Sequence, residues 1–164
     1  MEGLNLKNLS VLVVEDNDFM RQIIGKILRE FKITDITNAY NGRKARELVH
    51  SNNFDICFID WEIKDINGVE LIKFIREETD NNYVPIIMIT GYSTNDYIKI
   101  ARDAGITEYV IKPFSAEIIY KKIEEVIRRP RQFIRNFTYF GPDRRRTVEK
   151  DSGKYKGPER RSVK

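Results

Sequence analysis

The sequence predicts an α/β protein in which a parallel β-sheet is covered by helices on both faces. Short apolar runs alternate along the chain with longer segments in which apolar residues recur every three or four positions. These are the patterns of buried strands and amphipathic helices. Five segments of each kind alternate through short connections, and right-handed crossovers between them give a parallel sheet.

Five segments are predicted as strands because each is a short apolar run bounded by turn-forming or polar residues. The clearest is FDICFID, whose continuous apolar run fits a strand covered on both faces. In VPIIMIT the proline stands near the start, where a missing backbone donor is tolerated. The predicted strands are residues 9–14, 33–39, 54–59, 84–89 and 106–111.

Five helices are predicted between and after these strands. In the first, Asn17 is a good N-cap, and the following apolar residues are spaced by three and four positions. Asn41 and Gly42 form a turn before the second helix, and Gly105 caps the fourth. The predicted helices are residues 19–31, 43–51, 69–78, 95–103 and 116–129.

Composition limits the classes of protein that the chain can belong to. Hydrophobic residues make up 41% and charged residues 33%, as in soluble globular proteins. No apolar run reaches the roughly 20 residues needed to cross a bilayer, so we expect no membrane insertion, and the amino end lacks the pattern of a secretory signal. The single cysteine excludes an internal disulfide and fits a reducing cytoplasm. One cysteine and one histidine do not form a zinc site, so oxygen atoms would hold any metal.

Polar residues of complementary chemistry follow four of the predicted strands. Glu15 and Asp16 follow the first strand, Asp60 the third, Thr90 the fourth and Lys112 the fifth. The carboxyl ends of parallel strands meet at one edge, where α/β sheets bind ligands. Carboxylates gathered there repel one another unless a cation compensates, and Mg²⁺ suits such oxygen ligands. With a divalent ion the site could accept a phosphoryl group, with the Asp60 carboxylate as the nucleophile.

These residues resemble the receiver domain of bacterial two-component response regulators, the CheY-like fold. The resemblance rests on VLVVEDND at the first strand, on the strand-ending Asp60, on ITG at 89–91 and on YVIKPF at 109–114. It covers about residues 7–129, with the anchors in the right order. It implies a flavodoxin-like, five-stranded parallel sheet of order 2-1-3-4-5 with five helices.

The resemblance also implies roles for individual residues. Asp60 would accept the phosphoryl group from a phosphohistidine on a sensor histidine kinase or phosphotransfer protein. Asp16 would bind Mg²⁺, with help from Glu15, from Asp60 itself and from the backbone carbonyl of Glu62. The only histidine, His50, is remote in sequence from every anchor, so the donor would belong to another protein.

Three further residues would grip the phosphoryl group or respond to it. Thr90 and Lys112 would bind the phosphoryl oxygens, and Tyr109 would be the aromatic switch that turns inward with the threonine. The chain departs from the family pattern at Lys64, where a proline is frequent. Glu62 and Tyr92 occupy positions that in the family influence how fast the phosphoryl group is lost, and their effect here stays open.

Simpler interpretations stand beside these roles. Asp60 could be a helix-capping or ion-paired acid, and Lys112 could be its structural partner without any chemistry. Tyr109 could be a packing residue, and Cys57 is expected in the core. Trp61, next to Asp60, is expected to line the mouth of the site.

A basic tail follows the predicted receiver domain of residues 1–129. Residues 1–129 contain 18 Lys and Arg against 21 Asp and Glu, whereas residues 130–164 contain 11 against 4. The tail is predicted to be extended or partly disordered, although Phe133, Ile134 and Phe137 could pack back on the receiver or form a homodimer contact. It repeats an aromatic-x-Gly-Pro-acid-Arg-Arg motif at residues 139–145 and 155–161. The arginine pairs are candidate partner-binding residues: Arg144, Arg145, Arg160 and Arg161.

The predicted function is that of a stand-alone, cytoplasmic response regulator that switches its binding to a downstream protein when Asp60 is phosphorylated. We expect no enzyme activity beyond its own Mg²⁺-dependent phosphorylation and dephosphorylation. One alternative is a phosphohydrolase that acts through an aspartyl phosphate, for which no connection is long enough to supply a substrate cap. The other is a nucleic-acid-binding or adaptor protein that uses its basic tail, an interpretation that is not favoured.

Overall fold

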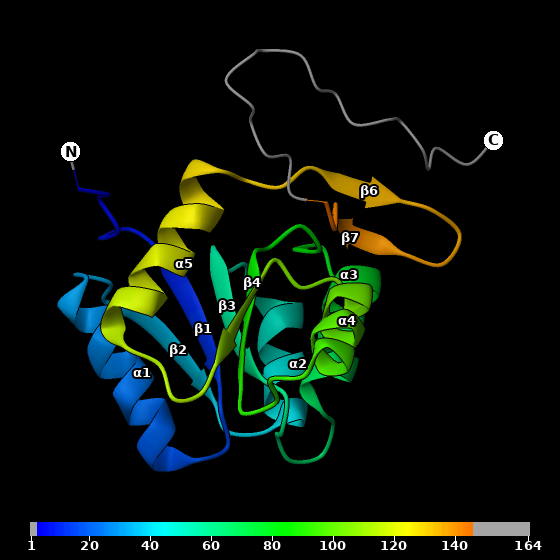
Figure 1. Cartoon of the computed structure of the whole chain (residues 1–164). Helices are drawn as coiled ribbons and strands as arrows, with labels where there is room; N and C mark the ends of the chain where they lie inside the picture. Colours follow the sequence, from blue (N-terminus) through cyan, green and yellow to red (C-terminus); the bar gives the residue numbers. More distant parts are fainter. Residues whose placement is uncertain (1–2, 146–164) are drawn as a thin grey trace, which may run out of the picture.

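A five-stranded parallel sheet forms the centre of the molecule (Figure 1). The structure is a computed structural model, and it describes residues 3–145. The strand order is β2-β1-β3-β4-β5, as the resemblance implied. The strands are β1 (Ser10–Val14), β2 (Asp35–Ala39), β3 (Ile56–Asp60), β4 (Ile86–Thr90) and β5 (Glu108–Ile111).

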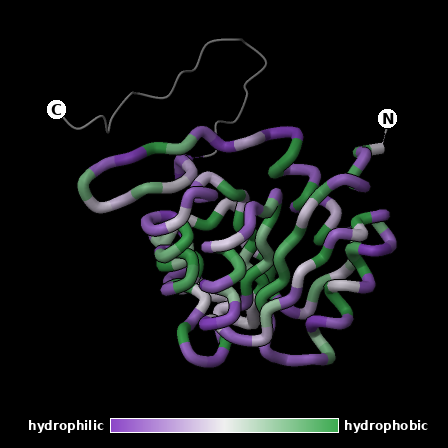
Figure 2. The backbone as a smooth tube through the Cα atoms, turned by 180° about the vertical axis from the view of Figure 1, so that it is seen from behind, coloured by the Kyte–Doolittle hydropathy of each residue, from purple (hydrophilic) through white to green (hydrophobic). Residues whose placement is uncertain are grey.

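Helices cover both faces of this sheet. Figure 2 shows the apolar strands in the interior, between helices that are more hydrophilic on their outer sides. The five predicted helices are present, with ends displaced by one to a few residues. They are α1 (Asp18–Glu30), α2 (Gly42–Ser51), α3 (Gly68–Glu78), α4 (Asn95–Ala104) and α5 (Ala116–Arg128).

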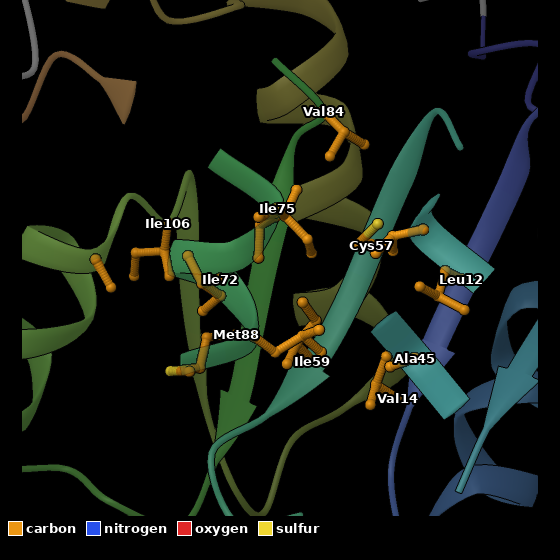
Figure 3. Close-up of a cluster of buried hydrophobic side chains, with 14 of the residues drawn as sticks. Leu12, Val14, Ala45, Cys57, Ile59, Ile72, Ile75, Val84, Met88 and Ile106 are labelled. Atoms are coloured by element: carbon orange, nitrogen blue, oxygen red, sulfur yellow. The ribbon is translucent and has the colours of Figure 1, made fainter. Parts of the chain in front are cut away.

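The alternation of strand side chains divides the core into two layers. Cys57 and Ile59 of β3 pack in one cluster with residues of α2, α3 and α4 (Figure 3). Ile56 and Phe58 of the same strand pack in the other cluster, with residues of α1 and α5. Every residue of β3 is buried, which explains its continuous apolar run. Cys57 is a free, fully buried thiol, as predicted.

Caps fix where the helices begin and end. The Asn17 side chain accepts a hydrogen bond of 2.9 Å from Met20 N, as its predicted N-cap role requires. Gly105 ends α4 with φ 111°, in the left-handed region that glycine adopts without strain. Both caps were predicted from the sequence.

A β-hairpin follows α5 and packs back on the receiver (Figure 1). It consists of β6 (Phe133–Arg135) and β7 (Phe140–Pro142), which pair antiparallel. Phe133 and Phe140 contact the ring of Tyr83, with centroids 4.9 Å and 5.2 Å apart. Residues 130–145 are therefore ordered rather than extended, and the boundary predicted at residue 129 does not end the folded part of the chain.

Phe137 does not pack back on the receiver, and a homodimer contact, the other alternative for this residue, stays a prediction. The side chain of Phe137 is 89% exposed, and the residue lies in the connection between β6 and β7. Phe133 and Ile134 are half-buried within the hairpin. The second motif copy, at residues 155–161, lies outside the described residues.

A buried arginine joins the hairpin to the core. Arg76 of α3 is 1% exposed, and it donates hydrogen bonds to the carbonyl oxygens of Asn82 (2.8 Å), Val84 (2.7 Å) and Gly105 (2.9 Å). Its guanidinium lies 5.0 Å from the centroid of the Phe133 ring. Burial lowers the pKa of Arg76 to about 10, so it stays charged at neutral pH. The arginine thus connects α3, the end of α4 and the hairpin.

Candidate functional site

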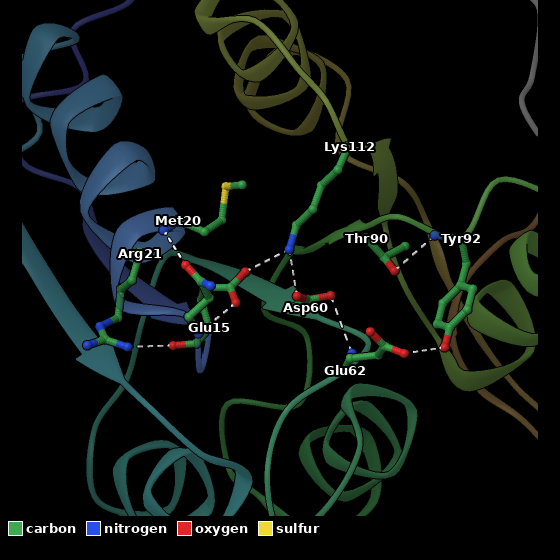
Figure 4. A network of polar contacts seen from close by, with 9 residues as sticks. Glu15, Met20, Arg21, Asp60, Glu62, Thr90, Tyr92 and Lys112 are labelled. Carbon is green, nitrogen blue, oxygen red and sulfur yellow. Dashed lines mark hydrogen bonds and ion pairs between the residues drawn. The ribbon is translucent and has the colours of Figure 1, made fainter.

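A lysine and two carboxylates meet at the carboxyl edge of the sheet (Figure 4). Lys112, directly after β5, lies with its Nζ 2.7 Å from Asp60 Oδ2 and 2.9 Å from Glu15 Oε2. Asp60 is the last residue of β3, and Glu15 follows β1. Both acids are buried, at 7% and 1% exposure. The sequence therefore predicted correctly that these three residues come together.

Burial and ion pairing change the affinity of this cluster for protons. Burial raises the pKa of Glu15, and the negative charge of Asp60 adds to this effect, although bonds from Lys112 and the Asn17 backbone oppose it. Burial alone would lower the pKa of Lys112, but its hydrogen bonds to Asp60 and Glu15 outweigh that effect and raise it. Lys112 therefore remains a cation beside two acids at neutral pH.

The loop after β1 is held by its own hydrogen bonds. Asn17 N donates to Glu15 Oε1 at 3.0 Å, and Arg21 Nη1 donates to the Glu15 carbonyl oxygen at 2.7 Å. Arg21 also forms an ion pair with Asp18. The Glu15 carboxylate is thereby oriented toward Lys112. The sequence prediction missed Arg21, which is one helical turn beyond the acids.

A close backbone approach fixes the loop after Asp60. Gly68 N donates a 2.8 Å hydrogen bond to the carbonyl oxygen of Trp61. A Cβ atom at Gly68 would lie 2.1 Å from the Asp60 carbonyl oxygen, so only glycine fits here. Asn67 caps α3 through a capping box with Glu70. Gly68 was also missed, although a glycine after an N-cap asparagine is a signal for such close packing.

A chain of hydrogen bonds runs from Asp60 to Tyr109. Glu62 N donates to Asp60 Oδ1 at 3.3 Å, and the Tyr92 hydroxyl donates to the Glu62 carboxylate. The Tyr109 hydroxyl donates to the Tyr92 carbonyl oxygen at 2.6 Å. The Thr90 Oγ1 accepts a bond of 3.3 Å from Tyr92 N. Thr90 and Tyr109 are therefore connected through Tyr92. The sequence did not predict this connection.

Aromatic rings crowd the mouth of the site. Tyr92 and Tyr97 stack with centroids 4.1 Å apart, and Trp61 meets both rings edge-on at 5.5 Å and 5.1 Å. The hydrogen bond to Glu62 raises the pKa of Tyr92 to about 12, so its hydroxyl is a donor at neutral pH. The expected place of Trp61 beside the site is confirmed. Tyr97 also belongs to this cluster of aromatic rings, and the sequence analysis did not predict it.

The oxygen atoms present are the donors that a hard cation prefers. Glu15 and Asp60 approach one ammonium group, and Asp16, half-buried, follows Glu15 directly. Within residues 3–145, however, no group of three or more His, Cys, Asp or Glu residues is arranged to hold a metal ion. Lys112 instead neutralises two of the expected ligands. Magnesium binding by Glu15, Asp16, Asp60 and the Glu62 carbonyl stays a prediction.

Of the two arginines in the first tail motif, one contacts the receiver and the other is exposed. Arg144 forms an ion pair with Asp103 of α4, and its guanidinium lies 4.2 Å from the centroid of the Tyr139 ring. The Tyr139 hydroxyl donates to the Pro142 carbonyl oxygen at 2.7 Å. Arg145 is exposed. The second pair, Arg160 and Arg161, lies outside the part of the chain that the structure describes.

Comparisons with known proteins agree with this fold. The family model of the response regulator receiver domain matches residues 11–124. The chemotaxis protein CheY of Pseudomonas aeruginosa is 34% identical, over 74% of this chain and 98% of that protein. The solved receiver domain of a Francisella response regulator is 29% identical with a TM-score of 0.68, covering 74% of this chain and 98% of that one.

A second solved structure with a similar fold is the receiver domain of a sensor histidine kinase from Pseudomonas aeruginosa PAO1. Its structure has a magnesium ion coordinated in the active-site cleft, and the likeness is one of fold, with 24% identity and a TM-score of 0.65. It covers 71% of this chain and 94% of the other. This chain belongs to the response regulator receiver domain family. It is homologous to CheY and to the receiver domains of two-component phosphorelays.

Proposed function

We propose that this protein is a response regulator that is phosphorylated on Asp60 and thereby changes which partner it binds. The observation that carries this proposal is the contact between Lys112 Nζ and Asp60 Oδ2 at 2.7 Å. Asp60 is an almost buried carboxylate at the carboxyl end of a central strand, next to a fixed cation. Such a site can accept an anionic group whose charge the cation neutralises.

The transfer needs few protein groups. An Asp60 oxygen forms a bond to phosphorus while the bond between phosphorus and the donor histidine nitrogen breaks, and the imidazole keeps the electron pair and takes up a proton. Lys112 occupies Oδ2, whereas Oδ1 accepts only a longer, 3.3 Å bond from Glu62 N among the described contacts. We therefore assign Oδ1 as the nucleophile. Lys112 and the Thr90 hydroxyl would bind the phosphoryl oxygens.

Magnesium is the expected cofactor. Asp16, Asp60 and the Glu62 carbonyl would hold the ion, with Glu15 assisting. Bound Mg²⁺ would neutralise charge on the phosphoryl oxygens during transfer. The hard oxygen donors of this chain support the assignment.

The partners follow from the same proposal. His50 lies exposed on α2, so the phosphodonor would be a sensor histidine kinase or phosphotransfer protein. A downstream protein would read the switched surface, and the protein would act in the cytoplasm. Among the described residues, no helix has the length and apolar character required to cross a membrane. We assign no catalysis on external substrates.

Incubation with acetyl phosphate and Mg²⁺, followed by intact mass measurement, tests the proposal. Wild-type protein should gain one phosphoryl group, and Asp60→Asn should gain none. The matched control is Asp65→Asn, which changes an exposed aspartate in the same loop and should be phosphorylated like the wild type. Equal phosphorylation of wild type and Asp60→Asn would refute the proposal. Continuous turnover of small phosphoesters would instead favour a phosphohydrolase.

A further inference from the structure

An exposed aromatic ring lies in the turn of the hairpin that follows α5. Phe137 connects β6 to β7, and its 89% exposure is the highest among the exposed large hydrophobic residues of the described chain. Figure 1 shows this connection at the outer edge of the molecule. Single exposed apolar residues are common on protein surfaces, so the surroundings of this ring decide what it can bind.

Hydrogen bonds hold the turn around Phe137. Asn136 N donates to the Tyr139 carbonyl oxygen at 2.9 Å, and Asn136 Oδ1 accepts bonds from the backbone and the hydroxyl of Thr138 at 3.0 Å and 3.2 Å. None of these bonds uses the Phe137 side chain. The ring is therefore presented on an ordered turn, which lowers the entropic cost of burying it in a partner.

The hairpin carries cations that have no acidic partner. Two of the four arginines in residues 130–145, Arg131 and Arg144, form ion pairs with the receiver. The other two, Arg135 and Arg145, are exposed, and neither forms an ion pair within the part of the chain that the structure describes. These two charges are available to an anionic ligand.

The chain beyond the hairpin has the same sign of charge. Residues 146–164 contain seven Lys and Arg against three Asp and Glu. An apolar ring combined with several cations is what binding to an anionic membrane surface requires, because the cations attract the headgroups and the ring enters the boundary with the acyl chains. Such peripheral attachment needs no membrane-spanning helix.

The remaining aromatic rings of the hairpin are unavailable for stacking on bases. Tyr139 and Phe140 are buried, and the half-buried ring of Phe133 contacts Tyr83 and Phe140. Single-stranded nucleic acids are usually bound by several aromatic side chains, on which successive bases stack. The one exposed ring of the hairpin, Phe137, therefore favours a lipid surface over a nucleic acid.

The hairpin and the phosphorylation site lie at opposite edges of the sheet. The hairpin packs on Tyr83, which precedes β4, whereas Asp60 is the last residue of β3. Because β3 and β4 are parallel, these positions are at opposite ends of the strands. A membrane bound at the hairpin would leave the edge with Asp60 open.

We infer that the hairpin attaches this protein to a membrane surface that contains anionic lipids. The Phe137 ring enters the boundary between headgroups and acyl chains, and Arg135 and Arg145 contact the headgroup phosphates. The attachment is peripheral, and it does not depend on phosphorylation of Asp60.

Co-sedimentation of the full-length protein with lipid vesicles tests the inference. Vesicles of phosphatidylglycerol mixed with phosphatidylcholine should bind the protein, and vesicles of phosphatidylcholine alone should not. Phe137→Ser should weaken binding about tenfold, because one aromatic side chain is no longer buried. Arg135→Gln should weaken it about fivefold, the effect of one charge near an anionic surface.

Two variants at the other edge of the sheet are matched controls. Phe19→Ser, at the start of α1, removes a ring that is 71% exposed, and Arg43→Gln, at the start of α2, removes an exposed cation. Both should bind vesicles like the wild type. Phe137→Trp should still bind, and its fluorescence should shift to shorter wavelength with the anionic vesicles. Phe19→Trp and the wild type, whose only tryptophan is Trp61, should show no shift.

Unchanged binding in Phe137→Ser, equal binding of both kinds of vesicle, or a missing shift in Phe137→Trp would overturn the inference. A labelled single-stranded oligonucleotide and sedimentation of the protein alone examine two other occupants. If the wild type bound the oligonucleotide or formed a dimer through Phe137 and did not bind vesicles, the ring would belong to that occupant instead. Asp60→Asn should bind vesicles like the wild type, so a failure of attachment and a failure of phosphorylation are separate results.

Discussion

The Tyr109 hydroxyl donates a 2.6 Å hydrogen bond to the carbonyl oxygen of Tyr92. Tyr109 lies in β5, and Tyr92 lies in the loop that follows Thr90. The bond ties the predicted switch residue to the loop that would have to move when Thr90 binds a phosphoryl oxygen. Tyr109 is therefore bonded to this loop and is not only a packing residue.

Replacing Tyr109 with phenylalanine should lower the free energy of unfolding by about 1 kcal/mol, the usual value of one hydrogen bond. Burial, with a smaller contribution from the charge of Asp60, raises the pKa of Tyr109 from 10.0 to about 12. The folded protein holds the Tyr109 hydroxyl proton more tightly than the unfolded chain does. The contribution of this hydrogen bond to the free energy of unfolding is therefore complete below pH 10. It is lost as the pH rises toward about 12.

Urea denaturation of both proteins across this pH range measures the difference. Tyr40→Phe, at a residue that is 56% exposed, is the control and should cost little at any pH. If the difference in free energy of unfolding between wild type and Tyr109→Phe grew above pH 10, it would contradict the stabilising role of the Tyr109 hydroxyl.

Replacing Tyr92 with phenylalanine should shorten the lifetime of phosphorylated Asp60. The Tyr92 hydroxyl bonds to the side chain of Glu62, two residues after Asp60, and we expect this pair to restrict the approach of water to the phosphoryl group. Loss of a bond of ~1.4 kcal/mol corresponds to about tenfold faster dephosphorylation. The decay of the phosphorylated mass after removal of acetyl phosphate measures this rate.

Tyr97→Phe is the matched control for this experiment. It keeps the ring that stacks on Tyr92 and should leave the decay rate unchanged. Slower decay in Tyr92→Phe would mean that the hydroxyl positions the attacking water instead of restricting it.

Replacing Arg76 with methionine should destabilise the fold by about 3 kcal/mol, because three carbonyl oxygens lose a charged donor in a buried place. It should also loosen the hairpin, since Phe133 packs on the guanidinium. Denaturation midpoints and hydrogen exchange at residues 133–142 measure the two effects. Lys73→Met, on the exposed side of α3, should change neither, and unaltered exchange in Arg76→Met would refute the connection to the hairpin.

The sequence was sufficient for the features that depend on local patterns. The continuous apolar run before Asp60 predicts a strand buried on both faces, and the alternation of strands and helices then brings Glu15, Asp60 and Lys112 to one edge. These arguments need only periodicity and the handedness of crossovers. Most element ends were predicted to within a few residues.

Contacts between distant segments could not be predicted in this way. From the sequence alone, Arg76 would be expected on the exposed side of its helix. The carbonyl groups of Gly105 and Val84, which accept its hydrogen bonds, come close to it only in the folded structure. The bond between Tyr92 and Glu62 also joins two separate loops. The hairpin depends on Tyr83, which offers the tail an aromatic surface that no pattern within residues 130–164 shows.

The central claim is that Asp60 carries the phosphoryl group, and locating the modified residue tests it most directly. Reduction of the acetyl-phosphate-treated protein with borohydride converts an aspartyl phosphate to homoserine, which peptide mass mapping then places in the sequence. We predict homoserine at position 60 in treated wild type, and at no position in protein treated without Mg²⁺. Homoserine at another aspartate, or an unmodified position 60 in protein that has gained a phosphoryl group, would contradict the account.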